Sequence, residues 1–189
     1  MNLTSSIIKE LREKSGAGMM DCKKALEESD GNVEKAIEWL RKKGINTAQK
    51  KSSRSASDGL ITVKITDNKG IIIEVNAETD FVARNENFQK FCDELALTGL
   101  KNEAENVESL LNYKFLDSNQ NVQEHLTNLI SKLGENIVIR KLEYINNKLG
   151  FLEKYLHNSI NLNSGKIGVL LSFNSNHETE KVNNFAKNI

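Results

Sequence analysis

The side chains that most often carry out chemistry are scarce in this sequence, and they are not grouped. It contains two cysteines, Cys22 and Cys92, and three histidines. No CxxC pair and no Cys/His cluster is present, so no zinc site is predicted. The segment SGAG (15–18) lacks the strand before it and the Lys-Ser/Thr after it that a phosphate-binding loop needs. We therefore expect no enzymatic activity, no bound metal and no cofactor.

A candidate for a different kind of functional element is AETDFVARNENF (77–88), where Asp80 precedes Phe81 after a strand-like run. Phe81 has two interpretations. Apolar residues at such junctions usually pack inside the protein. A phenylalanine on the surface would instead present a large apolar area with few rotamers to freeze when it inserts into another protein. Asp80 suits the first turn of a helix, with Thr79 as its N-cap. The residues alone leave both interpretations open.

The charge balance argues against a partner recognised by overall charge. The 189 residues carry 26 basic and 26 acidic side chains, although residues 1–57 carry 12 basic against 8 acidic. No global field therefore attracts a membrane or nucleic acid. No apolar run reaches the roughly 20 residues of a membrane span, and the N-terminus lacks a signal-peptide layout. We expect a cytoplasmic protein with reduced, buried cysteines.

The first part of the chain predicts a three-helix unit over residues 4–43. Apolar residues recur at helical spacing around Ile7 and Leu11, and the SGAG segment then breaks the helix. A second helix is expected from Met19, and a third from Val33 to a C-terminal glycine at Gly44.

Residues 45–58 have the composition of a linker. They are small, polar and basic, with almost nothing to bury, so we expect a flexible segment. A nucleic-acid tail is an alternative, but no aromatic residues are interleaved for base stacking.

The rest of the chain predicts an α+β body with antiparallel strands. The expected elements are a hairpin of 59–66 and 71–78, a helix over 79–100, two helical segments within 101–149 with a strand after Gly134, two strands at 151–157 and 166–173, and a helix from Thr179.

Several long segments resemble the bacterial elongation factor Ts family. They are 7–44, 58–88, LGENIVIRKLE (133–143) and the region from YLH to GKIGVLLSF (155–173). The first also resembles a ubiquitin-associated three-helix domain. The resemblance implies a three-helix domain at 1–44, a linker at 45–58, a core N-terminal subdomain at 59–150 and a second core subdomain beginning at 151–189. Family members usually continue beyond this point, so the chain is expected to be C-terminally short and its second subdomain incomplete.

The resemblance also implies a function, which is guanine nucleotide exchange in translation elongation. The implied partner is elongation factor Tu, both GDP-bound and nucleotide-free. In the family an Asp-Phe pair enters the GTPase and disturbs its Mg²⁺ and phosphate region. Here that element is Thr79, Asp80, Phe81 and Val82. Neither a membrane nor direct nucleic-acid binding is implied.

Further partner contacts are implied for Arg12, Met19, Met20, Lys23 and His157. For each, an ordinary role is the alternative: one methionine packed within the three-helix unit, or a solvated arginine or histidine. Between His157 and GKIGV this chain has NSINLNS, so the placement of His157 is open. A second functional hypothesis is an adaptor whose three-helix head binds a protein without nucleotide exchange. A third is RNA binding through 41–54.

Overall fold

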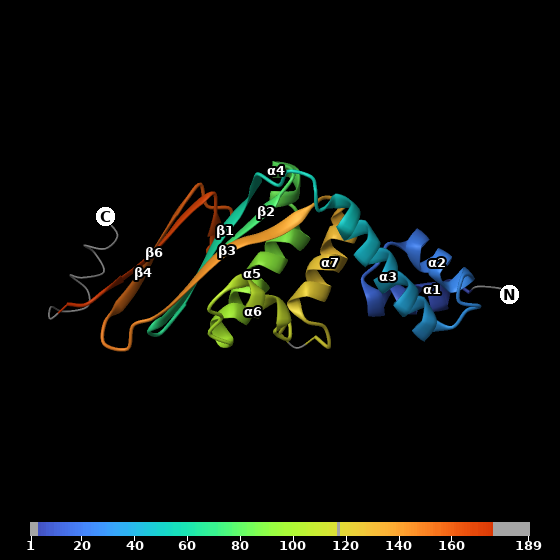
Figure 1. The fold of residues 1–189 in the computed structure, drawn as a ribbon, viewed down its shortest axis with the longest axis horizontal. Coiled ribbons are helices and arrows are strands. Elements are labelled where there is room, and N and C mark those ends of the chain that lie inside the picture. The colour runs from blue at the N-terminus through green and yellow to red at the C-terminus, as the bar shows by residue number, and fades with distance from the viewer. Residues whose placement is uncertain (1–3, 117, 176–189) are drawn as a thin grey trace. The chain divides into compact units, whose positions relative to one another are not determined.

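The computed structural model describes residues 4–116 and 118–175, and the chain divides into two compact units. The first unit extends to Ser55 and also includes Glu124–Asn136. The second unit comprises Ala56–Gln123 and the chain from Ile137 onward. Figure 1 shows the elements of both in chain order.

The first unit begins with the three helices that the sequence predicts, α1 (Ser5–Ser15), α2 (Met19–Glu27) and α3 (Val33–Lys51). Gly16 ends α1 with a φ of 67°, and its N–H donates to the carbonyl of Arg12 over 2.8 Å. Asn32 caps α3 by accepting the N–H of Lys35 over 3.0 Å. The buried core of this unit is formed by Leu11, Cys22, Ala25, Leu26 and Ala36.

The prediction that the third helix ends at Gly44 is wrong, because α3 continues for seven further residues to Lys51. The extension contacts a segment far away in sequence. The carbonyl of Gly134 accepts from Lys51 Nζ over 2.6 Å, and Thr127 of α7 (Val122–Leu133) lies close to Gly44. Tertiary contact thus overrides the low helix propensity of glycine. Residues 45–51 are helical rather than a flexible linker, and the remaining predicted domain boundaries stay predictions.

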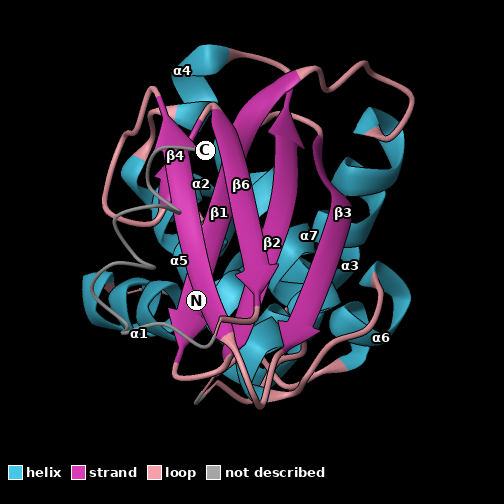
Figure 2. Ribbon diagram, turned by 90° about the vertical axis from the view of Figure 1, so that its left-hand side faces the viewer, coloured by secondary structure: helices cyan, strands magenta, loops and turns pink. Residues whose placement is uncertain are grey.

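The second unit is built on a four-stranded antiparallel sheet in the order β3-β2-β1-β5. Its strands are β1 (Asp58–Thr66), β2 (Lys69–Ala77), β3 (Ile137–Asn146) and β5 (Ser164–Gly165). β4 (Phe151–His157) and β6 (Ile167–Phe173) form a separate antiparallel pair. Figures 1 and 2 show this pair on one face of the sheet and α5 on the other. The α+β fold class is confirmed.

The helix predicted over 79–100 is two helices, α4 (Asp80–Ala83) and α5 (Glu86–Lys101). Asn85 separates them and caps α5 by accepting the N–H of Asn87. A further helix, α6 (Val107–Asn112), and α7 account for the two helical segments predicted within 101–149. The helix predicted from Thr179 lies outside the described residues.

The two faces of the sheet are buried by different elements. Ile71 and Ile73 of β2 face α5, where an added Cβ on Gly99 would lie 2.6 Å from Ile71 Cδ1. The opposite face receives the β4–β6 pair, with Leu152 and Leu170 against Gly70. The sheet is therefore covered on both sides.

Gly59 in β1 sits where no other residue fits. Its φ is 143°, and an added Cβ would lie 2.1 Å from the carbonyl oxygen of Val75. Both the backbone conformation and the close approach of β2 exclude a side chain.

We expect Gly59→Ala to lower the free energy of unfolding by at least about 2 kcal/mol, because it combines backbone strain with a clash against backbone. Gly44→Ala is the matched control. Its Cβ would meet Thr127 Cγ2 at an ordinary 3.5 Å, and alanine favours the helix by up to about 1 kcal/mol. Urea unfolding of both variants measures the two effects. Equal stabilities would contradict this account of Gly59.

Candidate functional site

α4 presents Phe81 to solvent. The Phe81 side chain is 80% exposed, whereas Val82 is 7% exposed and Ala83 is fully buried. Successive helical residues point about 100° apart, so packing Val82 and Ala83 toward β1 and β2 directs Phe81 outward. The interpretation of Phe81 as a core residue is therefore wrong.

The polar residues beside Phe81 are held within α4. Asp80 Oδ2 lies 3.0 Å from an Nη atom of Arg84, one helical turn later, and both side chains are partly exposed. Thr79 occupies the N-cap position with extended backbone angles, but its side chain makes no capping hydrogen bond. Asp80 thus lies beside Phe81 with its charge partly balanced.

Polar contacts link the end of β2, which leads into α4, to β1 and β3. Arg140 of β3 donates from Nε to Asn76 Oδ1 over 2.9 Å and from Nη2 to the carbonyl of Ala56 over 2.8 Å. Asn76 in turn donates from Nδ2 to the carbonyl of Asp58 over 3.1 Å. These bonds join β3, the end of β2 and the start of β1. They therefore fix the position of the end of β2, from which the chain continues into α4.

β4, whose last residue is His157, ends at the same end of the sheet as α4 (Figure 2). His157 has an exposed side chain. Its backbone carbonyl accepts the N–H of Lys166 over 3.1 Å. Lys166 Nζ forms a salt bridge with Asp58, whose strand position pairs with Ala77 at the end of β2. The structure therefore brings the predicted residues Phe81 and His157 to one end of the second unit.

A partly buried lysine network supports the segment after His157. Lys154 Nζ donates to the carbonyl of Leu162 over 2.9 Å and to Asn163 Oδ1 over 2.8 Å. Asn163 Nδ2 donates to Asp93, which also accepts from Lys64. Burial lowers the pKa of Lys154, and the nearby Lys64 lowers it further. No motif at these spacings could have predicted the network, because its members come from β1, β4, α5 and a loop.

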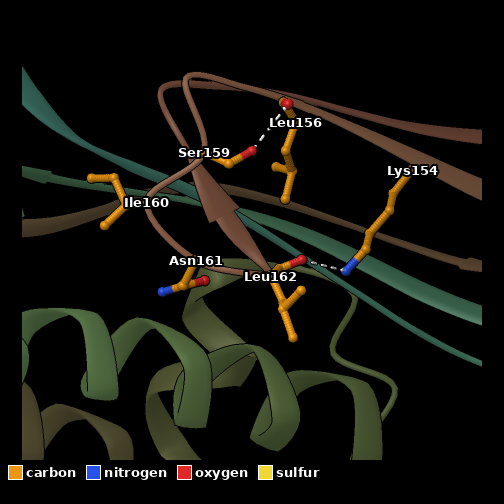
Figure 3. A pocket seen from close by; sticks show the side chains of 6 residues that line it. All are labelled: Lys154, Leu156, Ser159, Ile160, Asn161 and Leu162. Atoms are coloured by element: carbon orange, nitrogen blue, oxygen red, sulfur yellow. Dashed lines mark hydrogen bonds between the residues drawn. The ribbon is translucent and has the colours of Figure 1, made fainter.

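The pocket beside this network has few polar groups without a hydrogen-bond partner in the protein. Figure 3 shows its lining, which comprises Lys154, Leu156, Ser159, Ile160, Asn161 and Leu162. The Lys154 ammonium already has protein acceptors, and Ser159 Oγ donates to the carbonyl of Leu156. The lining therefore suits a supporting role for the loop better than a ligand site.

The other predicted contact residues gather at the turn between α1 and α2 in the first unit. Met19 and Met20 are 57% and 75% exposed, so neither is the packed methionine of the alternative interpretation. Arg12 is exposed in the last turn of α1. Lys23 Nζ lies 3.9 Å from Glu27 Oε1 on α2. This turn therefore carries two adaptable thioethers beside basic side chains.

The cysteines offer no reactive thiol. Cys22 and Cys92 are both buried, and burial raises the pKa of Cys92. Within residues 4–116 and 118–175 no group of three or more His, Cys, Asp or Glu side chains could hold a metal ion. None of the described helices has the length and apolar character to cross a membrane.

Comparison with known proteins gives a consistent result. The family model described as elongation factor TS matches residues 78–189, which include α4 and His157. The elongation factor Ts of Methylorubrum extorquens (strain PA1) is 44% identical over 188 residues, covering 100% of this chain and 61% of the relative. That of Rhodospirillum centenum is 46% identical over 190 residues, covering 99% of this chain and 61% of the relative. The chain thus spans about three-fifths of the length of these relatives.

The salt bridge between Asp58 and Lys166 gives a pH-dependent prediction. The Lys166 ammonium and the Gly59 N–H lower the pKa of Asp58 below its usual value. A lowered folded-state pKa contributes stability that is fully present above the unfolded-state pKa of about 3.9, and this is lost as the pH falls through the folded value. Both side chains are about one-third exposed, so solvent screening limits the contribution to at most about 1 kcal/mol.

We therefore expect Asp58→Asn to destabilise the protein at pH 7 and to have a smaller effect below pH 4. Urea unfolding of both proteins at several pH values measures this difference. A difference that is constant with pH would mean that Asp58 acts through its shape rather than through its charge.

Proposed function

Because the chain belongs to the elongation factor Ts family, we propose that it is a guanine nucleotide exchange factor of translation elongation. It binds elongation factor Tu carrying GDP in the cytoplasm and promotes the release of GDP. The observation that carries this proposal is Phe81, a large aromatic side chain left 80% exposed on a helix whose next two residues are buried.

The proposed mechanism follows from how a GTPase holds its nucleotide. The diphosphate is bound by the phosphate loop and a bridging Mg²⁺. An aromatic side chain that enters the partner near the metal displaces the charge that offsets the phosphates, so GDP binds less tightly. By linkage, GDP must weaken the binding of the exchange factor by the same factor. This chain supplies no chemical step, so it acts without being an enzyme.

The energy for this insertion comes from burying Phe81 in the partner. Fully burying a phenylalanine contributes roughly 1.5–3 kcal/mol. The anchored α4 helix lowers the entropic cost, because the side chain is already presented by a fixed backbone. In this proposal Asp80 makes a polar contact beside the ring, Val82 holds α4 on the sheet, and Thr79 begins the helix.

A second contact is proposed at the turn between α1 and α2. Met19 and Met20 offer exposed, flexible side chains that can fit an apolar surface of the GTPase. Arg12 and Lys23 add positive charge beside them. His157, at the same end of the sheet as Phe81, completes the proposed contact set of the second unit.

An adaptor without exchange activity is the second candidate. The exposed methionine pair favours it, because such a surface can bind a partner without inserting Phe81 as an apolar wedge. Linkage separates the two candidates. An exchange factor binds nucleotide-free elongation factor Tu, and excess GDP lowers its apparent affinity by at least about tenfold. An adaptor binds equally with and without GDP. Titration of the purified chain against the GTPase in both states makes this measurement. RNA binding through 41–54 would instead appear as a steep salt dependence of binding to RNA.

The wedge predicts a strong effect of Phe81→Ala. We expect the variant to accelerate GDP release from elongation factor Tu at least about tenfold less than the unchanged chain, since each 1.4 kcal/mol corresponds to a factor of ten. Release of a fluorescent GDP analogue measures the rate. Because Phe81 is exposed, urea unfolding of the variant should be nearly unchanged.

Leu149→Ala is the matched control. Leu149 is 92% exposed and belongs to the loop between β3 and β4, and this loop lies at the end of the sheet opposite α4 (Figure 2). The Leu149→Ala substitution removes a similar exposed apolar side chain, and we expect an unchanged acceleration of GDP release. Equal losses for the two variants, or undiminished release with Phe81→Ala, would rule out the wedge.

A further inference from the structure

Tyr155 and His157 share the outward face of β4. They are two residues apart in a strand, so their side chains point to the same side. Across the strand pair they face Val169 and Ile167 of β6, and both of these residues are about half exposed. The other face of β4 carries Leu152, which packs toward the sheet at Gly70. Tyr155 and His157 therefore lie on the face turned away from the sheet.

The two side chains are joined by one hydrogen bond. Tyr155 Oη lies 3.0 Å from His157 Nδ1, and the ring planes are inclined by 35°. A neutral imidazole has one donor and one acceptor nitrogen, and the bond made by one nitrogen sets the role of the other. An unprotonated imidazole nitrogen is a better hydrogen-bond acceptor than a phenol oxygen, so the Tyr155 O–H is the natural donor and Nδ1 the acceptor. The imidazole proton then resides on Nε2.

We propose that Tyr155 is a positioning residue for His157, an inference that rests on the exchange function proposed above. Its hydroxyl holds the imidazole as the Nε2–H tautomer and fixes the ring orientation. The exposed Nε2–H is then a preset hydrogen-bond donor for an acceptor of the GTPase. This end of the sheet thus presents an apolar wedge, Phe81, and an oriented donor, His157.

The exposure of the pair argues against a role in stability. Tyr155 is 55% exposed and His157 is exposed, so water competes for this hydrogen bond and its net contribution to folding is small. The hydrogen bond instead orders the His157 imidazole before the partner binds. Fixing the tautomer and the rotamer before binding lowers the entropic cost of the contact with the partner.

The tautomer can be measured directly on the full chain. In the ¹⁵N spectrum of imidazole-labelled protein near pH 8.5, where an ordinary histidine is neutral, we expect the Nε2–H pattern for His157. Tyr155→Phe should convert it to a mixture of tautomers. The sequence has three histidines, so loss of the signals in His157→Gln assigns them. An Nδ1–H pattern in the unchanged chain, or identical His157 shifts in Tyr155→Phe, would overturn the proposal.

Exchange assays test whether the orientation matters. We expect Tyr155→Phe to reduce the acceleration of GDP release about two- to tenfold, the usual effect of one hydrogen bond. His157→Gln, whose amide N–H reaches the Nε2 position, should retain more activity than His157→Asn, whose shorter amide reaches only Nδ1. In the His157→Gln background, Tyr155→Phe should have no further effect. The same fold reduction by Tyr155→Phe in both backgrounds would mean that Tyr155 acts independently of His157.

Tyr113→Phe is the matched control, because Tyr113 lies at the end of α6 rather than on β4. It should leave both the His157 spectrum and the exchange rate unchanged. If the unchanged chain does not accelerate GDP release at all, the exchange function is wrong, and the spectra alone decide whether Tyr155 sets the tautomer.

Discussion

The presentation of Phe81 depends on the burial of Val82 and Ala83 against the strands beneath α4. A four-residue helix has little stability of its own, because too few backbone hydrogen bonds offset the cost of nucleation. Its orientation must therefore come from packing and from the strand ends that hold it. Arg140, Asn76 and Gly59 supply that support, two through hydrogen bonds and one by permitting close contact between strands. The exposed aromatic ring follows from what lies buried next to it.

The parts of the fold that the sequence predicted are those with strong periodicity. The β1–β2 hairpin, α5 and the three helices of the first unit have apolar residues at regular spacing, and each appears where a strand or helix is expected, although α3 continues past Gly44 and α4 is separate from α5. The error at Gly44 has a physical cause. Glycine is a poor helix former and a common helix end, so local preference predicted a stop. The contacts of α3 with Thr127 and Gly134 come from more than 80 residues away, and no local pattern reports them.

The candidate site was predictable only in part. A resemblance to a family implied Phe81 and His157, while the residues alone left a buried and an exposed phenylalanine both open. Periodicity could not settle the matter, because α4 is only one turn long. The supporting residues were not predictable. The hydrogen bonds of Lys154 and Tyr155 are seen only in the folded unit, and single charged or aromatic residues on a strand carry no sequence signal for such contacts.

The division into units has a consequence for how the polypeptide can be taken apart. Because Glu124–Asn136 belongs with the first unit, the backbone passes from one unit to the other three times. A protease cut or gene truncation near residue 55 would separate α3 from the segment that carries α7, where Gly134 and Glu124 contact Lys51 and Arg41 of α3. Closing a loop of this length also costs chain entropy before any contact forms. The first unit is thus completed by residues that are synthesised much later than its N-terminal helices. Until the ribosome has made those residues, the last turns of α3 lack their contacts with α7 and Gly134.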